Sequence, residues 1–442
     1  MKNKYLRIKY IISILLNEHN SKKDRKKITN LLDADFNQHG QHYEEYSSIH
    51  LKKMINLALT LPFYKAFFDK SNLSDISLSD FPIIDKSIIK ENKELLIVKS
   101  NSPRTQRNTG GSTGQPFTLL SSPELRNIEI AHQEYFYQRM GFIKGDKIYS
   151  IDGFRPNRRS INKNVFWRKN HINGFPYGHL RFSASDMHSS NVRHYYEKIL
   201  KDKPQYLRGY PSALTMLAQY ILDNGVYSEF IKGVMLTSEM IKMPQIETCY
   251  KAFNAPIMPQ YGMAEACAFG FTAQQSLKYY LSPYYGSIEI VDENGCHVNK
   301  GESGQIVVTS YHNMVQPMIR YRTGDIAEYG GIHNGFPVLN KIMGRTQDYL
   351  INKDNQKIMI VGLIHGSHFE PLNHIRHWQI IQNTIGAVEV VIDQTNTWEK
   401  KHELEVKKLL SFNTTLSVSI RYGENFIKSN AGKKLFVVQQ IK

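Results

Sequence analysis

The sequence predicts an α/β protein with more than one domain, and three observations lead to this prediction. The chain has 442 residues, far more than one typical domain, and 41% of them are hydrophobic, as in ordinary globular proteins. Between residues 148 and 260, short apolar runs alternate with helical stretches, a pattern typical of parallel strands joined by crossover helices. After residue 275, apolar and polar residues alternate, which predicts antiparallel strands.

The first hundred residues are predicted to be mainly helical. Apolar residues recur at helical spacing from Leu51 to Leu59, and Pro62 ends that helix. The basic stretch Met1–Lys9 precedes an apolar run, Tyr10–Leu16, which is too short to span a bilayer and lacks a cleavage site. We therefore expect an amphipathic first helix, no transmembrane segment and a cytoplasmic protein.

Later elements are predicted from the period of their apolar residues. Arg320–Asp325 is expected at a turn, and the last ninety or so residues show a βαβ-like pattern of the size of a small lobe. The predicted helices are Glu124–Met140, Ser212–Asn224, Pro244–Phe253 and Lys400–Leu410. The predicted strands are Phe117–Ser121, Ile148–Ile151, Tyr206–Gly209, Gly233–Thr237, Ile257–Gln260, Gly286–Val291, Gly304–Thr309, Glu389–Ile392 and Leu416–Tyr422.

Charge and cysteine content narrow the function classes. A net charge of +16 favours anionic partners such as nucleotides, a phosphorylated cofactor, nucleic acid or a membrane face. There is no zinc-finger spacing, ribonucleoprotein motif or arginine-rich tract, so we expect no nucleic-acid partner. Cys249, Cys267 and Cys296 are odd in number and widely spaced, which favours a reducing compartment over a disulfide framework or a four-cysteine metal site.

The stretch Thr109-Gly110-Gly111-Ser112-Thr113-Gly114-Gln115-Pro116 predicts a tight loop, because its glycines and closing proline disfavour a helix or a packed strand. It offers backbone N–H groups and hydroxyls without bulky side chains, as a phosphate requires. Gln115 and Pro116 stand where a kinase-type P-loop has Lys and then Ser or Thr. The residues alone leave a phosphate loop and a surface linker as alternatives.

Two neighbouring predicted strands are followed by polar residues. Thr237-Ser238-Glu239 ends one strand, and the stretch Gln260–Glu265 ends the next. Ligands of open α/β sheets bind at the carboxyl ends of the strands. These two segments are therefore predicted to line a binding site.

Five motifs follow one another along the chain, and together they resemble the ordered motifs of the adenylate-forming superfamily of acyl-CoA synthetases. The resemblance covers residues 60 to 435 and is strongest to the phenylacetate–CoA ligase family, in particular its CapK-like branch of capsular-polysaccharide biosynthesis proteins. Leu61–Tyr64, Arg208–Ser212 and Gln379–Gln382 resemble that branch. The motifs are the glycine-rich stretch, Tyr-Gly-Met-Ala-Glu (261–265), Tyr-Arg-Thr-Gly-Asp (321–325), Gly-Arg-Thr-Gln-Asp (344–348) and Ala-Gly-Lys (431–433).

The resemblance implies a large multi-sheet adenylation domain over residues 1–343, whose first hundred residues are a mainly helical lead-in. A hinge at 344–348 and a small, mobile α+β lid domain over 349–442 would follow. It further implies an AMP-forming ligase of the acid–thiol type, which converts a small carboxylic acid and ATP into an acyl-adenylate and pyrophosphate. The acyl group would then pass to coenzyme A, with Mg²⁺ as the metal, in surface-polysaccharide biosynthesis.

The resemblance also assigns a role to each motif residue. Thr109, Gly110, Gly111, Ser112, Thr113 and Gly114 would hold the β- and γ-phosphates. Tyr261, with Gly262, would pack beside the adenine, and Asp325 would accept the ribose hydroxyls. Glu265 would bind Mg²⁺, Arg345 would lie by the ribose and phosphate between the lobes, and Glu239 would be a weaker nucleotide contact. Lys433 would span the α-phosphate and the substrate carboxylate.

Three positions depart from the family's pattern. Ala264 replaces a usual threonine near the α-phosphate, Gln347 replaces a usual aspartate at the hinge, and Thr237-Ser238 replaces a usual Gly-Gly before Glu239. Two alternatives therefore stay open beside the coenzyme A ligase. One is amide formation on an amino sugar or amino acid, and the other is an inactive assembly protein that keeps the fold.

The acid itself, the acceptor and the oligomeric state are not specified by the residues. Aromatic residues suggest that the acid pocket is built from Tyr135–Met140 and Tyr206–Tyr210. His365, His368, His374 and His377 lie in two pairs three residues apart. Since no cysteine or carboxylate spacing accompanies them, we expect structural or exposed histidines in preference to a metal site.

Overall fold

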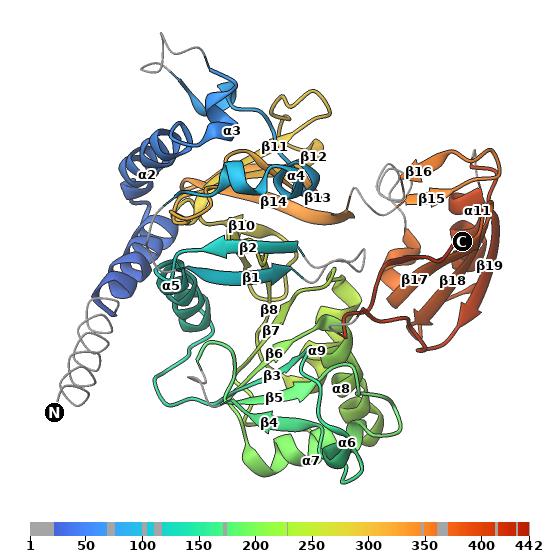
Figure 1. Ribbon diagram of the computed structural model, residues 1–442. Coiled ribbons are helices and arrows are strands. Elements are labelled where there is room, and N and C mark those ends of the chain that lie inside the picture. The colour runs from blue at the N-terminus through green and yellow to red at the C-terminus, as the bar shows by residue number, and fades with distance from the viewer. Residues whose placement is uncertain are drawn as a thin grey trace.

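The computed structural model describes residues 22–68, 76–99, 104–109, 117–170, 175–227, 229–345, 349–359, 370–411, 414–429 and 432–441. These residues form a large lobe and a smaller C-terminal lobe beside it (Figure 1). The predicted first helix and residues 110–116 of the glycine-rich stretch lie outside the described residues. The predicted two-lobed α/β fold is confirmed.

A mixed sheet of 12 strands runs through the large lobe. Its strands are β3 (Ile148–Asp152), β4 (Trp167–Lys169), β5 (Leu180–Ser183), β6 (Tyr206–Gly209), β7 (Gly233–Thr237), β8 (Ile257–Gly262), β9 (Phe269–Thr272), β10 (Tyr279–Leu281), β11 (Gly286–Val291), β12 (Ser303–Ser310), β13 (Tyr321–His333) and β14 (Phe336–Arg345). Their order is β11-β12-β13-β14-β10-β9-β8-β7-β6-β3-β5-β4.

The sheet changes character at β8. The strands β5, β3, β6, β7 and β8 pair in parallel, whereas every pairing from β8 to β11 is antiparallel. The short edge strand β4 pairs antiparallel with β5. The predicted change from crossover connections to antiparallel strands is thus confirmed.

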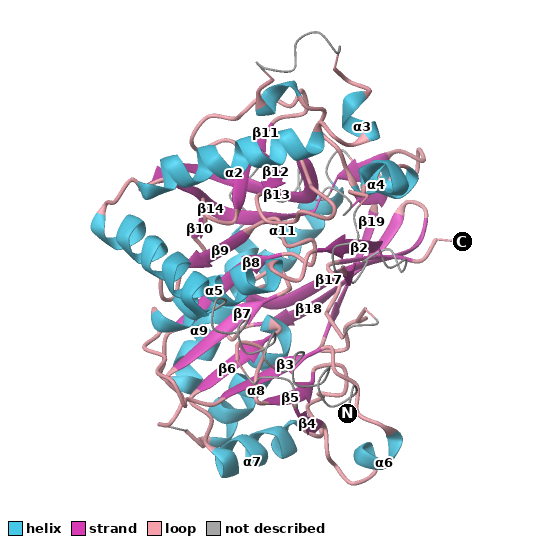
Figure 2. Cartoon of the chain, turned by 60° about the vertical axis from the view of Figure 1, so that its left-hand side comes forward, coloured by secondary structure: helices cyan, strands magenta, loops and turns pink. Residues whose placement is uncertain are grey.

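Helices cover both faces of the parallel half of the sheet. Successive side chains of a strand point to opposite faces, so one strand contributes residues to both cores. Val234 and Leu236 of β7 join the core beneath three helices, whereas Met235 joins the core on the other face. The three helices are α7 (Val192–Asp202), α8 (Pro211–Asn224) and α9 (Met243–Phe253); the other face packs on α5 (Leu125–Gln138) and a helix over residues 22–38 (Figure 2). A strand buried on both faces reads as a continuous apolar run, which explains why these strands were predictable.

The N-terminal segment packs on the antiparallel half. Met54, Ala58 and Tyr64 are fully buried against strands β10 to β13. The elements of this segment are α2 (His42–Ala58), α3 (Pro62–Lys65), η1 (Leu78–Asp80), α4 (Lys86–Glu91) and η2 (Lys93–Leu96), and they precede the ribbon of β1 (Thr105–Thr109) and β2 (Phe117–Ser121). The remaining short helix, α6 (Arg158–Ile161), follows β3.

The small lobe is built on a four-stranded sheet of order β19-β18-β17-β20. Its strands β18 and β19 pair in parallel through α11, as the βαβ-like pattern predicted. Trp378, Val390 and Leu410 lie in its core. The elements of this lobe are β15 (Tyr349–Ile351), β16 (Lys357–Met359), η3 (Glu370–His374), β17 (Ile375–Thr384), β18 (Ala387–Gln394), α11 (Lys400–Ser411), β19 (Ser417–Tyr422) and β20 (Val437–Gln439).

One expectation about the large lobe is wrong. The stretch Arg320–Asp325 was expected at a turn, but from Tyr321 onward it is the first part of the long strand β13. Gly324, with φ +83°, and register shifts on both edges of β13 make its start irregular, so the polar residues resemble a turn in sequence. No helix among the described residues is long and apolar enough to cross a membrane.

Arg320 fixes the start of β13. Its side chain is 8% exposed and forms two contacts with the Glu289 carboxylate, at 2.9 and 3.2 Å. The same guanidinium donates to the carbonyls of Ser79 and Phe81, at 3.2 and 3.1 Å. It therefore ties the N-terminal segment to the strand that carries Asp325.

Replacing Arg320 with leucine should lower the free energy of unfolding by about 3–5 kcal/mol, because the partly buried Glu289 carboxylate and the carbonyls of Ser79 and Phe81 would lose the donor that they share. Chemical denaturation measures this change. Arg193→Leu, at an exposed position of α7, is the matched control and should cost less than about 0.5 kcal/mol. Equal stabilities of the two variants would show that Arg320 does not hold this part of the fold.

Candidate active site

A single cleft contains all of the described side chains that were assigned to the site from sequence. It lies at the carboxyl ends of β7 and β8, along the Asp325–Arg345 end of β13 and β14, and under residues 433–437 of the small lobe. Its volume of about 870 Å³ lies within the usual range for small-molecule sites. The cleft is lined by Glu239, Tyr261, Gly262, Glu265, Asp325, Arg345 and Lys433.

Asp325 is the centre of this group. The Tyr261 hydroxyl donates to Oδ2 of Asp325 at 2.8 Å, and Nε of Arg345 donates to Oδ1 at 3.0 Å. Asp325 raises the pKa of Arg345, while burial raises the pKa of Tyr261 well above its usual value. A carboxylate has about four acceptor positions, so Asp325 keeps capacity for two further donors.

Glu265 lies on the loop after β8, and Oε1 accepts a hydrogen bond from the Tyr321 hydroxyl at 3.1 Å. Mg²⁺ is usually held by one or two carboxylates together with substrate phosphates and water. Glu265 fits that donor set because it brings one carboxylate to the cleft. Ala264, next to it, brings no oxygen from its side chain, as the sequence indicated.

Glu239 joins the two lobes. Its carboxylate accepts hydrogen bonds from the backbone and hydroxyl of Ser212, at 2.9 and 3.0 Å, and from the backbone N–H of Lys434 at 2.9 Å. Burial raises the pKa of Glu239 above its usual value. Ser238 before it has φ +74°, a conformation that favours glycine, so the Thr-Ser-Glu sequence turns here at some cost in strain.

Lys433 extends from a tight turn of the small lobe. The turn is closed by the bond from Ser429 N–H to the Lys433 carbonyl, at 2.8 Å, and Gly432 has φ +77°. A side chain at Gly432 would come within about 3.0 Å of the Ser185 backbone, so the turn packs closely on the large lobe. Burial lowers the pKa of Lys433, whose ammonium lies 5.8 Å from the centre of the Tyr210 ring.

The two residues that flank the glycine-rich positions 110–116 lie side by side. Thr109 is the last residue of β1 and pairs with Phe117 of β2, so the two ends of the loop lie together. Arg107, two residues earlier, makes two contacts with Glu129 of α5, at 2.9 and 2.7 Å. Gly110, Gly111, Ser112, Thr113 and Gly114 lie outside the described residues.

The predicted acid pocket is partly wrong. Tyr135, Phe136, Tyr137 and Met140 are buried in the core between α5 and the sheet and do not line the cleft. Gln133 and Glu129, about one and two turns before Tyr137 on α5, line it in their place. The signal that sequence reasoning missed is a pair of polar residues four apart on the otherwise apolar face of this helix.

Arg208 of β6 lies in the stretch Tyr206–Tyr210, also predicted for the acid pocket, and it does line the cleft. Its guanidinium lies over the Tyr177 ring at 5.3 Å. Lys86 and Lys242 also line the cleft and had no sequence signal, because their neighbours along the chain resemble ordinary surface segments.

Positive groups accumulate where the small lobe meets the large one. The Lys428 ammonium donates to the carbonyls of Ala184, Ser185 and Met187, at 3.0, 3.2 and 3.4 Å. Lys242 lies 5.1 Å from the centre of the Trp378 ring, and burial lowers its pKa to about 7. The lobes are thus held together by cations in contact with carbonyls and rings.

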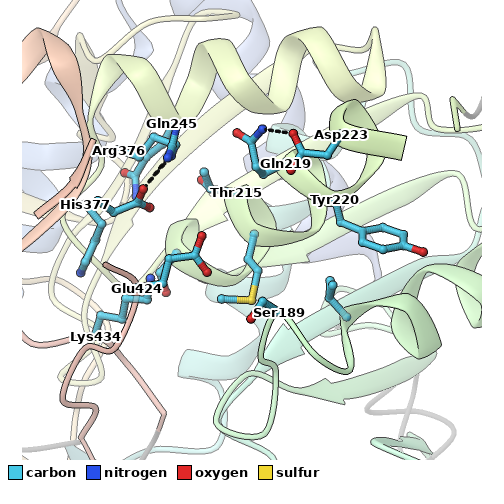
Figure 3. Close-up of a pocket in the computed structure, with 14 residues that line it drawn as sticks. Ser189, Thr215, Gln219, Tyr220, Asp223, Gln245, Arg376, His377, Glu424 and Lys434 are labelled. Carbon is cyan, nitrogen blue, oxygen red and sulfur yellow. Dashed lines mark hydrogen bonds and ion pairs between the residues drawn. The ribbon is translucent and has the colours of Figure 1, made fainter. Parts of the chain in front are cut away.

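A smaller pocket, with a volume of about 160 Å³, lies between the lobes (Figure 3). It shares His377 and Lys434 with the main cleft. Its wall contains the ion pair of Arg376 with Asp393, at 2.6 Å, and the hydrogen bond from Gln219 to Asp223, at 2.7 Å. Both lobes therefore contribute polar groups to a space adjoining the candidate active site.

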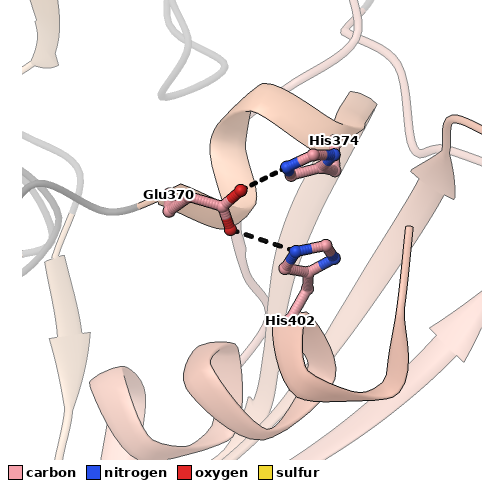
Figure 4. A group of neighbouring side chains, drawn as sticks. All are labelled: Glu370, His374 and His402. Atoms are coloured by element: carbon pink, nitrogen blue, oxygen red, sulfur yellow. Dashed lines mark hydrogen bonds and ion pairs between the residues drawn. The ribbon is translucent and has the colours of Figure 1, made fainter. Parts of the chain in front are cut away.

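The described histidines of the two sequence pairs do not lie together in the structure. His365 and His368 lie outside the described residues, and the half-buried His377 packs against the Phe426 ring. His374 instead joins Glu370 and His402, the one group of three possible metal ligands among the described residues (Figure 4). His402 accepts a hydrogen bond at Nδ1 from the Glu399 N–H, at 2.9 Å. Nδ1 of His402 is therefore already occupied, and its Nε2 lies 3.0 Å from the Glu370 carboxylate, which favours an ion-paired cluster over a metal site.

The fold is similar to that of two ligases of known structure. The chain resembles 2-hydroxyisobutyryl-CoA ligase in its postadenylation state in complex with R3-HIB-AMP, with a TM-score of 0.60, 17% identity and 88% of each chain covered. The TM-score to the same ligase is 0.53 in its thioesterification state. It also resembles AtGH3.15 acyl acid amido synthetase in complex with 2,4-DB, with a TM-score of 0.59, 11% identity, and 90% of this chain and 89% of that one covered.

The sequence is similar to Protein CapK of Staphylococcus aureus. The two are 26% identical over 424 residues, which cover 92% of this chain and 90% of CapK. No family model matches the chain. The predicted resemblance to CapK-like proteins is confirmed by this similarity, and the solved structures have the fold that the five motifs led us to expect.

Replacing Lys428 with methionine should favour separation of the lobes, because three large-lobe carbonyls would lose the ammonium that they share. Small-angle X-ray scattering should then give a larger radius of gyration than for the unmodified protein. Lys408→Met, at an exposed position of α11, is the control and should leave the radius unchanged. The same radius for both variants would remove Lys428 from the contacts that dock the lobe.

Proposed function

We propose that the protein activates a small carboxylic acid with ATP, forming an acyl-adenylate and pyrophosphate, and transfers the acyl group to coenzyme A. The observation that carries the proposal is the meeting of two lobes in one cleft. The large lobe contributes Asp325 with its partners Tyr261 and Arg345, and the small lobe contributes Lys433.

Adenylation brings two anions together, so its transition state needs positive charge and accurate positioning. In the proposed reaction a carboxylate oxygen attacks the α-phosphorus and pyrophosphate leaves. Asp325 has acceptor positions for the two ribose hydroxyls, and Tyr261 would pack beside the adenine. Arg345 and Lys433 are the cations that would face the negative charge on the phosphate and the acid.

The ATP phosphates would be held by the loop that begins at Thr109, for which the pairing of Thr109 with Phe117 provides a closed base. Glu265 would be the carboxylate ligand of Mg²⁺, and the ion would neutralise phosphate charge when bound. Glu239 holds the backbone of Lys434 and so would position the adjacent Lys433.

In the second step a nucleophile attacks the acyl carbonyl and AMP leaves. Coenzyme A is the acceptor that the acid–thiol ligase resemblance favours, and a role in surface-polysaccharide biosynthesis follows from the likeness to the CapK-like branch. The likeness to an acyl acid amido synthetase supports an amine as the alternative acceptor. The carboxylates of Asp223 and Glu424 in the pocket between the lobes favour the same alternative, since they would attract a protonated amine.

Asp325→Ala should weaken ATP binding at least tenfold, since charge-assisted hydrogen bonds contribute about 1.5–3 kcal/mol each. Calorimetry with ATP and Mg²⁺ measures the affinity. Glu328→Ala, which removes a carboxylate from the same strand but outside the cleft lining, is the control for folding and charge. Unchanged ATP affinity in folded Asp325→Ala protein would exclude Asp325 from the nucleotide site.

Lys433→Ala should lower the rate of carboxylate-dependent ATP–pyrophosphate exchange by about 10²-fold or more, as for loss of a preorganised electrostatic contact. ATP affinity should change little, because the contact matters most in the transition state. Lys434 is the matched control. Its ammonium lies over the Phe426 ring, and alanine keeps its backbone bond to Glu239, so exchange should fall far less.

Transfer from supplied acyl-adenylate to coenzyme A should survive the Lys433→Ala change, because the small lobe would turn about residues 344–348 and carry Lys433 away. Mass spectrometry of the thioester follows this step. Discharge by an amine alone would establish the alternative acceptor. Folded protein that binds ATP but shows no exchange with a broad library of acids would favour the inactive assembly protein.

A further inference from the structure

The cleft continues beyond the residues proposed to bind the nucleotide into an end where polar side chains lie beside the rings of Tyr177, Phe269 and Tyr285. This end is formed by Arg208 of β6, Gln260 of β8, Gln133 of α5 and Tyr177. It is the part of the cleft where the acid would lie if the adenosine occupied the Asp325 end. The inference below rests on the proposed function and concerns the chemical class of that acid.

Two buried amides at this end lack partners among the described residues. Gln133 is 5% exposed and Gln260 is 8% exposed, and the side-chain oxygen of each has no hydrogen bond there. A buried amide oxygen without a donor costs about 1–3 kcal/mol. Both amides line the cleft, so a ligand with hydroxyl groups can satisfy them.

Arg208 is also short of partners. Its one hydrogen bond among the described residues runs from Nε to the Met235 sulfur at 3.3 Å, a weak acceptor, and its face lies over Tyr177. The terminal N–H groups of the guanidinium have no carboxylate opposite them in the described part of the chain. The planar N–H groups of the Arg208 guanidinium can therefore bind a carboxylate or another oxygen-bearing group of a ligand.

The charged groups near Tyr177 also favour an oxygen-bearing ligand. The guanidinium groups of Arg107, Arg126 and Arg208 and the single carboxylate of Glu129 act on the Tyr177 hydroxyl, although burial is the largest cause of its raised pKa. Glu129 is already paired with Arg107. Arg208 therefore remains a cation of the cleft lining without a carboxylate partner among the described residues, which favours an acid with oxygen at its far end.

We propose that the far end of the cleft selects a small acid whose own far end carries oxygen, a second carboxylate or a hydroxyl group, in preference to an alkyl or aromatic acid. Arg208 is the residue that determines this specificity, with Gln133 and Gln260 as hydrogen-bonding partners. The aromatic residues that the sequence suggested on α5 belong to the core instead.

Calorimetry on the full-length protein, in the presence of a non-hydrolysable ATP analogue, tests this proposal. Butanoate, 4-hydroxybutanoate and succinate have the same chain length and differ only at the far end. Succinate and 4-hydroxybutanoate should each bind at least about tenfold more tightly than butanoate, because a site built to hydrogen-bond its substrate rejects an analogue that lacks the polar group. Butanoate binding as tightly as both would overturn the proposal.

Arg208→Gln should remove most of the advantage of succinate over butanoate. Gln133→Leu provides a second variant, and it should reduce the advantage of 4-hydroxybutanoate. Arg193→Gln, at an exposed position of α7, is the matched control and should keep the full preference. A preference that survives both changes in the cleft would also overturn the proposal.

These measurements report binding, so they are separate from the test of the proposed function. Selective binding of succinate without any pyrophosphate exchange would refute adenylation and leave the substrate class standing. Exchange that runs best with butanoate or an aromatic acid would support adenylation and refute the substrate class.

Discussion

The candidate active site depends on the hydrogen bonds that Asp325 receives from Tyr261 and Arg345. Arg345 lies opposite Asp325 in the register of β13 and β14, so sheet pairing alone brings them together. Tyr261 is on β8, and three strands separate β8 from β13 in the sheet order. In a flat sheet four strand spacings would separate them by roughly 19 Å. A hydrogen bond of 2.8 Å between the two side chains therefore requires this part of the sheet to curl strongly around the cleft.

Closing the small lobe over this cleft brings positive groups into a low-dielectric environment. Burial lowers the pKa values of Lys242, Lys428, Lys433 and Lys434, and it lowers that of His377 well below its usual range. Burying like charges together is costly unless anions compensate them. The protein supplies Glu239 and several carbonyls at the lobe interface. A bound anionic nucleotide would add further compensation, so ligand binding and lobe closure are expected to be coupled.

Much of the fold followed from the sequence because its strands are either buried on both faces or alternate cleanly. The strands β3, β6, β7 and β8 are short, mostly buried runs, and apolar and polar residues alternate in β11. The short strands β4, β9 and β10 were not predicted, since three or four residues give too little periodicity. The strand β17 was also missed, because its buried Gln379 and Gln382 bond to the backbone of neighbouring segments and read as loop residues.

The site was predictable only where a motif marks it. Asp325, Arg345 and Lys433 stand in recognisable segments, and the structure brings all three to one cleft. Arg208 lay within the stretch Tyr206–Tyr210 that was predicted for the acid pocket. Gln133 and Lys242 could not be found in this way, since their position depends on which helix turn and which loop face the cleft. Tyr135 and Tyr137 show the opposite error, because aromatic residues fill a core as readily as they line a pocket.

A crystal structure of the full-length protein with ATP and Mg²⁺ tests the central claim most directly. The account predicts ribose hydroxyls on the Asp325 carboxylate and phosphates toward the loop that follows Thr109. It also predicts the Lys433 ammonium within about 3 Å of an α-phosphate oxygen. A nucleotide bound outside this cleft, or inside it with its ribose away from Asp325 and its α-phosphate away from Lys433, would contradict the account.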